Sequence, residues 1–184
     1  MICRSETLTV FEDTRQKEGK HENIHSCLQE MGVNVVRRCL SVGDYMLEGN
    51  DKVSVDTKNG ILEVCTDLGA DRARFNREML RAKNLGIKLY ILVEDFRFHR
   101  VADVATRWNN PISKKNPFCM DGKELSFRMR SAEIAYGVTF VFCRKKNAGR
   151  VVLKLLGVKD ERTKSEKASC CPKDGNGSAS RDDR

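Results

Sequence analysis

The sequence lacks long hydrophobic runs. No apolar stretch approaches the roughly 18 residues that a membrane-spanning helix needs, which excludes a transmembrane helix. The first residues, MICRSETLTVFED, also lack the apolar segment of a signal peptide. We therefore expect a protein that is not secreted, resides in the cytoplasm and has no membrane partner.

The eight cysteines lack the pairing that metal sites and disulfide scaffolds show. None stands in a C-x-x-C pair, and the adjacent Cys170 and Cys171 cannot form a usual structural clip. Cys39, Cys65 and Cys143 fall within expected apolar elements, where a free cysteine behaves as a small hydrophobic residue. We expect reduced thiols, without structural zinc.

Acidic residues are in deficit, with 26 of them against 34 basic residues, which gives a formal net charge of +8. Residues 160–184 hold six of each sign, so the whole excess lies in residues 1–159. This balance suits a polyanion such as nucleic acid, although a basic protein without such a partner explains it equally well. The charged, apolar-poor end predicts one folded domain over residues 1–158 and a disordered charged tail over 159–184.

Hydrophobic periodicity predicts strands and helices that alternate along the chain. Strands are expected at 7–11, 33–39, 87–95 and 138–143, and a two-stranded hairpin within 40–60. Helices are expected at about 22–31, 61–68, 71–86, 101–108, 123–136 and 147–157. Hairpin strands followed by strand–helix–strand crossovers predict an α/β fold, with a mixed central sheet and helices on both faces.

The hairpin LSVGDYMLEGNDKVSVDTKNG, residues 40–60, carries an unusual polar face. If its loop spans residues 48–52, Leu47 pairs with Val53 and Asp44 pairs with Asp56, while Lys58 lies on the same face. Two carboxylates so close repel each other unless one is protonated or a cation lies between them. Their oxygen donors suit Mg²⁺ or Mn²⁺. A solvated hairpin face without a metal is the alternative.

A metal site beside a lysine is suited to phosphodiester hydrolysis. The ion binds the scissile phosphate and lowers the pKa of a water molecule, while the lysine orients that water or offsets charge in the transition state. The hairpin therefore makes nuclease chemistry a specific hypothesis.

Four segments in order extend this hypothesis: TVFEDTRQ, LSVGDYML, VSVDTKNG and KLYILVED. They resemble the nuclease domain of the XPF family of structure-selective DNA endonucleases, which shows D-x-R-E, G-D-Y and E-R-K at similar intervals. The resemblance covers residues 7–95 well and the chain up to about 157 more loosely, and it is greatest to short stand-alone members from bacteria and phages. It implies the restriction-endonuclease-like fold, Mg²⁺ or Mn²⁺, and cleavage of branched or flapped DNA in repair or recombination.

By matching position, the resemblance implies a role for five residues. Asp44 and Asp56 would be metal ligands, and Lys58 the catalytic lysine. Asp13 would assist the metal site, and Arg15 would bind phosphate or brace the carboxylates.

Four positions depart from the family pattern. Asp56 replaces a glutamate; it is one methylene shorter but remains a workable ligand. Gln16 replaces a glutamate, which removes a charge. Thr57 replaces an arginine, which removes a phosphate contact. The aspartate expected four residues after the lysine is Leu62 here, and Glu63, one residue further on, is a candidate to take its place.

DNA contacts are expected from basic residues elsewhere. Arg74, Arg77 and Arg81 form one helical stripe, and Lys114 and Lys115 lie in a loop, although solvated surface explains both groups as well.

The sequence leaves several interpretations open. Trp108 near that loop either stacks on DNA or is buried, and His21, His25 and His99 are interpreted as incidental. The family's helix-hairpin-helix module has no counterpart in the tail, so substrate choice is expected to come from this domain, from a second copy (a homodimer) or partner protein, or from both. A non-catalytic DNA-binding subunit and a basic protein with a purely structural hairpin are the two alternatives.

Overall fold

The computed structural model describes residues 8–16, 19–116 and 118–158, and the expected tail at 159–184 lies outside these residues. The strands are β1 (Thr9–Asp13), β2 (Asn34–Arg38), β3 (Tyr45–Leu47), β4 (Asn50–Lys58), β5 (Lys88–Val93) and β6 (Thr139–Phe142). The helices are α1 (Glu22–Glu30), α2 (Ile61–Leu68), α3 (Arg72–Asn84), α4 (Val101–Arg107), α5 (Gly122–Tyr136) and α6 (Ala148–Leu155), with short 3₁₀ helices η1 (Pro111–Lys114) and η2 (Lys145–Asn147). Each predicted helix and strand is present, although Thr7, the expected start of the first strand, lies outside the described residues.

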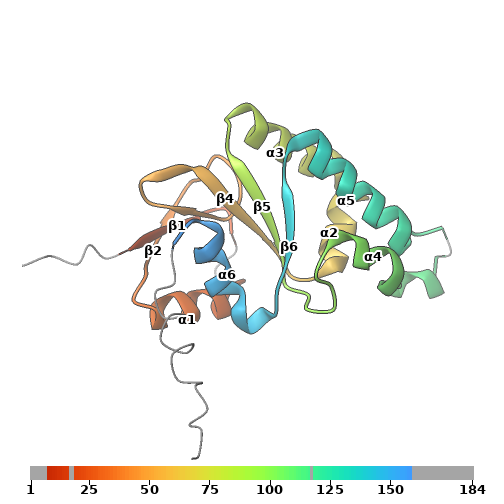
Figure 1. Ribbon diagram of the computed structural model, residues 1–184, viewed down its shortest axis with the longest axis horizontal. Helices are drawn as coiled ribbons and strands as arrows, with labels where there is room; N and C mark the ends of the chain where they lie inside the picture. Colours follow the sequence, from red (N-terminus) through yellow and green to blue (C-terminus); the bar gives the residue numbers. More distant parts are fainter. Residues whose placement is uncertain (1–7, 17–18, 117, 159–184) are drawn as a thin grey trace, which may run out of the picture.

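The strands form one mixed sheet in the order β2-β1-β3-β4-β5-β6 (Figure 1). The hairpin β3–β4 is antiparallel, and β3 also pairs antiparallel with β1. The other neighbours are parallel: β1 with β2, β4 with β5, and β5 with β6. The predicted α/β fold with a mixed central sheet is therefore confirmed.

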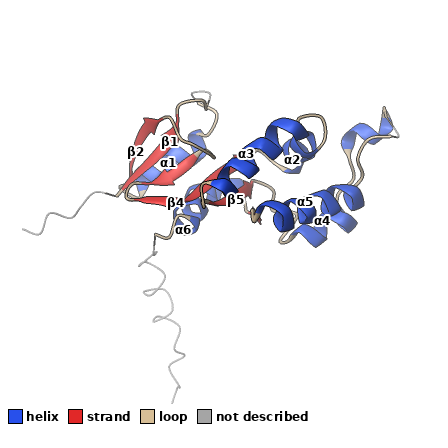
Figure 2. Ribbon diagram, turned by 90° about the horizontal axis from the view of Figure 1, so that it is seen from above, coloured by secondary structure: helices blue, strands red, loops and turns tan. Residues whose placement is uncertain are grey.

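Helices cover both faces of this sheet, as Figure 2 shows from above. On one face α1 and α6 pack through Ile24, Leu28 and Val152 against Tyr45 and other buried strand residues. On the other face α2, α3, α4 and α5 form a second cluster with β5 and β6. Each fully buried aliphatic or aromatic side chain contributes about 2 kcal/mol of hydrophobic stabilisation.

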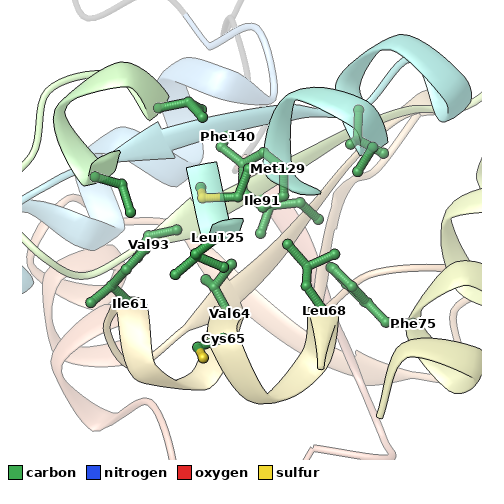
Figure 3. Packing of buried hydrophobic residues seen from close by; sticks show 14 of the residues in the cluster. Ile61, Val64, Cys65, Leu68, Phe75, Ile91, Val93, Leu125, Met129 and Phe140 are labelled. Carbon is green, nitrogen blue, oxygen red and sulfur yellow. The ribbon is translucent and has the colours of Figure 1, made fainter. Parts of the chain in front are cut away.

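The second cluster holds the helices that border the polar part of the hairpin (Figure 3). The predicted stripe of α3 is buried, with Phe75 and Met79 inaccessible to solvent and Ala82 nearly so. Helix α2, α5 and the strands contribute most of the remaining side chains: Ile61, Val64, Cys65, Leu68, Ile91, Val93, Leu125, Met129 and Phe140. Packing of α2 and α3 against β4 and β5 fixes the wall beside which Lys58 lies.

The hairpin loop is shorter than predicted. Leu47 lies opposite Asn50, not Val53, and the register shifts between Met46 and Leu47. The physical reason is an irregularity in β4, which absorbs the extra residues that the prediction assigned to a longer loop. At the inner end Tyr45 lies opposite Val55, as the predicted register requires, and the backbone N–H of Asp44, which precedes β3, donates to the Val55 carbonyl at 2.8 Å.

Trp108 belongs to the core and is 4% exposed, so of its two predicted alternatives, stacking on DNA and burial, burial is the one that the structure shows. It follows α4 and packs in the cluster that α5 closes. Among the described residues, no helix is long and apolar enough to cross a membrane.

Candidate active site

The polar end of the hairpin opens into a pocket of about 530 Å³. The pocket brings together residues from the ends of β1 and β4, from the turn before β3, and from α2 and α3. It is lined by Asp13, Arg15, Gln16, Lys20, Gly43, Asp44, Asp56, Thr57, Lys58, Glu63, Arg74 and Glu78. All five residues that the sequence predicts for the catalytic centre are in this set.

Gly43 shapes the turn that delivers Asp44 to the pocket. Its backbone φ is +69°, and a Cβ there would lie 2.3 Å from Ser54 Oγ. Ser54 occupies that space because its hydroxyl donates to the carbonyl of Val42 at 2.8 Å. Glycine is therefore needed at this position both for the backbone conformation and for the close approach of β4. After this turn, Asp44 faces the pocket and Tyr45 enters the opposite core.

Asp44 is buried and held by neutral donors. Its Oδ2 accepts from the backbone N–H of Thr57 at 2.7 Å and from the Thr57 hydroxyl at 2.6 Å. The Gln16 side chain also hydrogen-bonds the carboxylate. Burial raises the pKa of Asp44 above its usual range, and these hydrogen bonds oppose that shift. Gln16, which stands where the family pattern has glutamate, thus binds Asp44 through its amide.

Lys58 lies between two buried aspartates. Its Nζ is 2.8 Å from Asp56 Oδ2 and 2.8 Å from Asp67 Oδ2, and it lies 4.9 Å from the centre of the Phe75 ring. Burial alone would lower the pKa of Lys58, but the two carboxylates raise it, so the ammonium is charged at neutral pH. Burial raises the pKa of Asp56 to about 7, although the attraction of Lys58 opposes the shift.

Asp67 was not predicted from the sequence. It is 3% exposed, and its second oxygen accepts from Arg74 Nη2 at 2.7 Å. The family pattern pointed to position 62, where Leu62 is 40% exposed. One feature of the sequence could have predicted a role for Asp67. It lies beside the apolar stripe of α2, and a carboxylate next to a buried helical face needs a partner.

Glu63 and Glu78 also line the pocket. Glu63 accepts from the backbone N–H of Asn59 at 2.6 Å and lies 3.4 Å from Lys20 Nζ, so it closes the turn before α2. Glu78 reaches from α3 to the backbone N–H of Gly43 at 3.2 Å. Burial raises the pKa of Glu78. Its place on a predominantly basic helix gave no sign of this contact.

Asp13 and Arg15 form a pair at the end of β1. Arg15 Nε donates to Asp13 Oδ2 at 2.6 Å, and Arg15 Nη2 forms an ion pair with the same oxygen and donates to the Leu40 carbonyl at 2.8 Å. The Asp13 side chain is 5% exposed and that of Arg15 53% exposed. Asp13 therefore holds Arg15 at the rim of the pocket.

The residues predicted to contact DNA divide into three groups. Arg74 is part of the pocket, where it binds a buried carboxylate. Arg77 and Arg81 are exposed on α3 outside the pocket lining, and Arg81 donates to a backbone carbonyl at 3.2 Å. Lys114 and Lys115 are exposed at η1, also outside the pocket lining.

Two of the histidines interpreted as incidental make buried or partly buried contacts. His21 is 4% exposed and lies beside Thr57, with 3.2 Å between Nε2 and the threonine hydroxyl. His25 Nε2 lies 2.8 Å from Glu12 Oε1. His99 uses its backbone N–H to bind Asp103 and has no place in the pocket lining.

The donor chemistry of the pocket fits Mg²⁺ or Mn²⁺. Asp44 and Asp56 offer two buried carboxylates, although no group of three or more His, Cys, Asp or Glu side chains in the described part of the chain is arranged as a metal cage. Mg²⁺ is commonly held by one or two carboxylates plus waters and phosphate oxygens of the substrate. Because burial raises the pKa of both aspartates, a nearby cation would stabilise their charged forms.

Comparisons with known proteins agree with this fold. The XPF from Aeropyrum pernix matches with a TM-score of 0.55 and 17% identity, over 96% of this chain and 68% of that chain. The same protein in complex with DNA matches with a TM-score of 0.58 and 19% identity, over 90% and 68%. A comparison with curated protein sequences gave no match. The family described as the ERCC4 domain matches residues 13–155, which confirms the XPF-type resemblance, and the chain belongs to this family.

Proposed function

We propose that this chain is a divalent-metal-dependent DNA endonuclease that hydrolyses phosphodiester bonds in branched or flapped DNA. The observation that carries the proposal is the meeting of Asp44, Asp56 and Lys58 in one pocket. Two further findings support DNA as the substrate: a structural neighbour was solved in complex with DNA, and the net charge of this chain is +8.

Asp44 and Asp56 would hold Mg²⁺ or Mn²⁺ with oxygens of the scissile phosphate. A divalent ion in this place would polarise the phosphate and lower the pKa of a bound water. Asp56 contributes a carboxylate that Lys58 holds 2.8 Å away, so its orientation toward the pocket is fixed before substrate binds. Asp13 assists this site through its hold on Arg15.

Lys58 acts as a hydrogen-bond donor and a fixed positive charge. Its pKa is raised by two carboxylates, so the ammonium does not accept a proton from the attacking water. It can instead orient that water through an N–H and offset the negative charge that develops on the phosphate. Asp67 keeps the ammonium in place from the side of α2.

Arginines at the rim would bind the flanking phosphates. Arg15 and Arg74 each form an ion pair with a buried aspartate, while 53% and 56% of their side chains, respectively, stay exposed. Such anchored guanidinium groups bind phosphate with little further loss of side-chain freedom. Arg77, Arg81 and the lysines of η1 would contribute weaker, salt-dependent contacts further along the DNA.

Cleavage assays with matched variants test the function. We expect the wild type to cut branched or flapped DNA only with Mg²⁺ or Mn²⁺, and both Asp56→Asn and Lys58→Ala to lose at least about 100-fold in rate. Asp51→Asn is the matched control, because the Asp51 side chain is 84% exposed on the hairpin. DNA binding without cleavage in any metal would contradict the proposal, and absence of DNA binding at low salt would remove DNA as the substrate.

A non-catalytic DNA-binding subunit is the second candidate. The observation in its favour is Gln16, which hydrogen-bonds Asp44 where the family pattern has a glutamate. On this reading, the wild type binds DNA without cutting it, and Gln16→Glu restores metal-dependent cleavage. Cleavage by the wild type decides against this candidate.

A second copy of the chain or a partner protein would assist substrate choice in either case. Light scattering of the purified chain, alone and with flapped DNA, measures whether it pairs with itself. If the chain is a monomer in both conditions, a homodimer is excluded, and substrate choice would come from a partner protein or from this domain alone.

A further inference from the structure

A line of polar side chains connects the start of α1 to Asp44. His21 precedes the helix, and its Nε2 lies 3.2 Å from Thr57 Oγ1. The same hydroxyl lies 2.6 Å from Asp44 Oδ2. All three residues are buried, with 4%, 1% and 7% of their surface exposed in this order. Water therefore does not compete for these bonds.

The direction of each hydrogen bond follows from the groups present. The carboxylate of Asp44 accepts, so the Thr57 hydroxyl donates to it and has only lone pairs left for His21. His21 must then donate from Nε2–H. Burial lowers the pKa of His21 to about 4, so the imidazole carries a single N–H at neutral pH, and this contact assigns that hydrogen to Nε2.

The imidazole is fixed by packing on its other sides. Its ring meets Tyr45 edge to face, with 6.4 Å between ring centres. Its Nδ1 lies 3.9 Å from Glu94 Oε1, which is too far for a hydrogen bond, and this oxygen has no other hydrogen-bond partner in the described part of the protein. Within this environment, the Thr57 hydroxyl is the acceptor that the His21 N–H reaches.

We propose that His21 and Thr57 are positioning residues that hold the Asp44 carboxylate in the orientation that binds a divalent cation. The inference rests on the proposed function. Two donors of Thr57 converge on Oδ2, which fixes the plane of the carboxylate and leaves Oδ1 free of threonine contacts. The family pattern has arginine at position 57. This chain has Thr57 there instead, whose hydroxyl binds both Asp44 and His21.

Metal affinity measured without DNA tests the proposal. Calorimetry with Mn²⁺ should show binding weakened about 10- to 100-fold in Thr57→Val, while Thr57→Ser, which keeps the hydroxyl, stays within about threefold of the wild type. His21→Leu should weaken binding about 10-fold, and adding it to Thr57→Val should cause no further loss, because both act through one hydroxyl. His25→Ala, in the helix that follows His21, is the matched control, since His25 binds Glu12 instead.

Thermal melting of each variant separates loss of folding from loss of positioning. The wild-type nitrogen chemical shifts of His21 give a second readout, because an Nδ1–H tautomer in the spectrum would overturn the proposal even if His21→Leu does not fold. Unchanged Mn²⁺ affinity in a folded Thr57→Val protein would overturn this inference alone. A wild type that binds neither Mn²⁺ nor Mg²⁺ would overturn the proposed function and the inference together.

Discussion

Replacing Asp67 by asparagine should disturb the charge balance around two cations at once, the buried Lys58 and the partly exposed Arg74. Both carboxylate oxygens are engaged, Oδ2 at 2.8 Å from Lys58 Nζ and Oδ1 at 2.7 Å from Arg74 Nη2. An asparagine has one acceptor oxygen and one NH₂ group, so it binds one cation and turns a donor toward the other. The variant leaves Asp56 as the main partner of a buried ammonium.

The expected loss can be estimated from burial. The side chains of Lys58 and Asp67 are 6% and 5% exposed, so water does not replace their interaction when it is removed. Removing one partner of such a buried pair destabilises a protein by about 3–5 kcal/mol. The Arg74 side chain is 56% exposed and loses less than about 1 kcal/mol. Because Asp56 still pairs with Lys58, we expect a loss near the lower limit, about 3 kcal/mol in the free energy of unfolding.

Urea denaturation followed by tryptophan fluorescence measures this loss, since the one tryptophan, Trp108, is buried in the core. The control is Asp71→Asn, whose side chain is 52% exposed and lies 3.9 Å from the same Arg74. Its free energy of unfolding should change by less than about 0.5 kcal/mol. An Asp67→Asn protein as stable as this control would refute the reasoning that Asp67 neutralises a buried Lys58.

Three further predictions concern the turn, the buried histidine and the core. Gly43→Ala should cost about 2–4 kcal/mol in urea denaturation, since its Cβ would lie 2.3 Å from a hydroxyl oxygen, whereas Gly49→Ala, with open space around it, should cost about 1 kcal/mol. The contribution of His21 to the free energy of unfolding should fall by up to about 3 kcal/mol between pH 6.5 and 4, because the unfolded chain binds a proton at His21 before the folded one does. It is measured as the difference between the wild type and His21→Gln, since burial raises the pKa of Asp56 and Glu78, which changes stability in the opposite direction as pH falls. Trp108→Phe should keep its DNA affinity within about twofold by fluorescence anisotropy, and a large loss in a folded variant would return Trp108 to the DNA surface.

The helices and strands could be predicted because the local spacing of apolar residues indicates which of their sides are buried. Phe75 and Met79 recur at helical spacing in α3 and are buried as expected, and the continuous apolar run of β5 is the buried strand it predicts. The pairing of β3 with β4 could be predicted only at its inner end. The loop end depends on an irregularity near Leu47, and the side-chain pattern carries no sign of it.

The site could be predicted as far as its residues lie in contiguous motifs. Asp44, Asp56 and Lys58 stand on one hairpin, so strand geometry alone brings them together. Asp67 and Glu78 reach the pocket from helices, and their contacts depend on how α2 and α3 pack against the sheet. Residue spacing does not fix that packing, so the sequence indicated Glu63 rather than Asp67 as the substitute for the family's aspartate.

The contacts of the aspartates explain why the proposed cation would bind beside Asp44 rather than beside Asp13 or Asp67. Asp13 is paired with Arg15, and Asp67 with Lys58 and Arg74, while Asp56 shares the same ammonium. Asp44 is instead bound by hydroxyl, amide and backbone donors, which orient a carboxylate without cancelling its charge. Among the pocket's aspartates, a divalent cation would therefore meet the least compensated charge at Asp44, with Asp56 as the neighbouring carboxylate. On this argument the change from glutamate to Gln16 removes one negative charge but adds a donor that keeps Asp44 in place, so the substitution by itself would not abolish the proposed metal site.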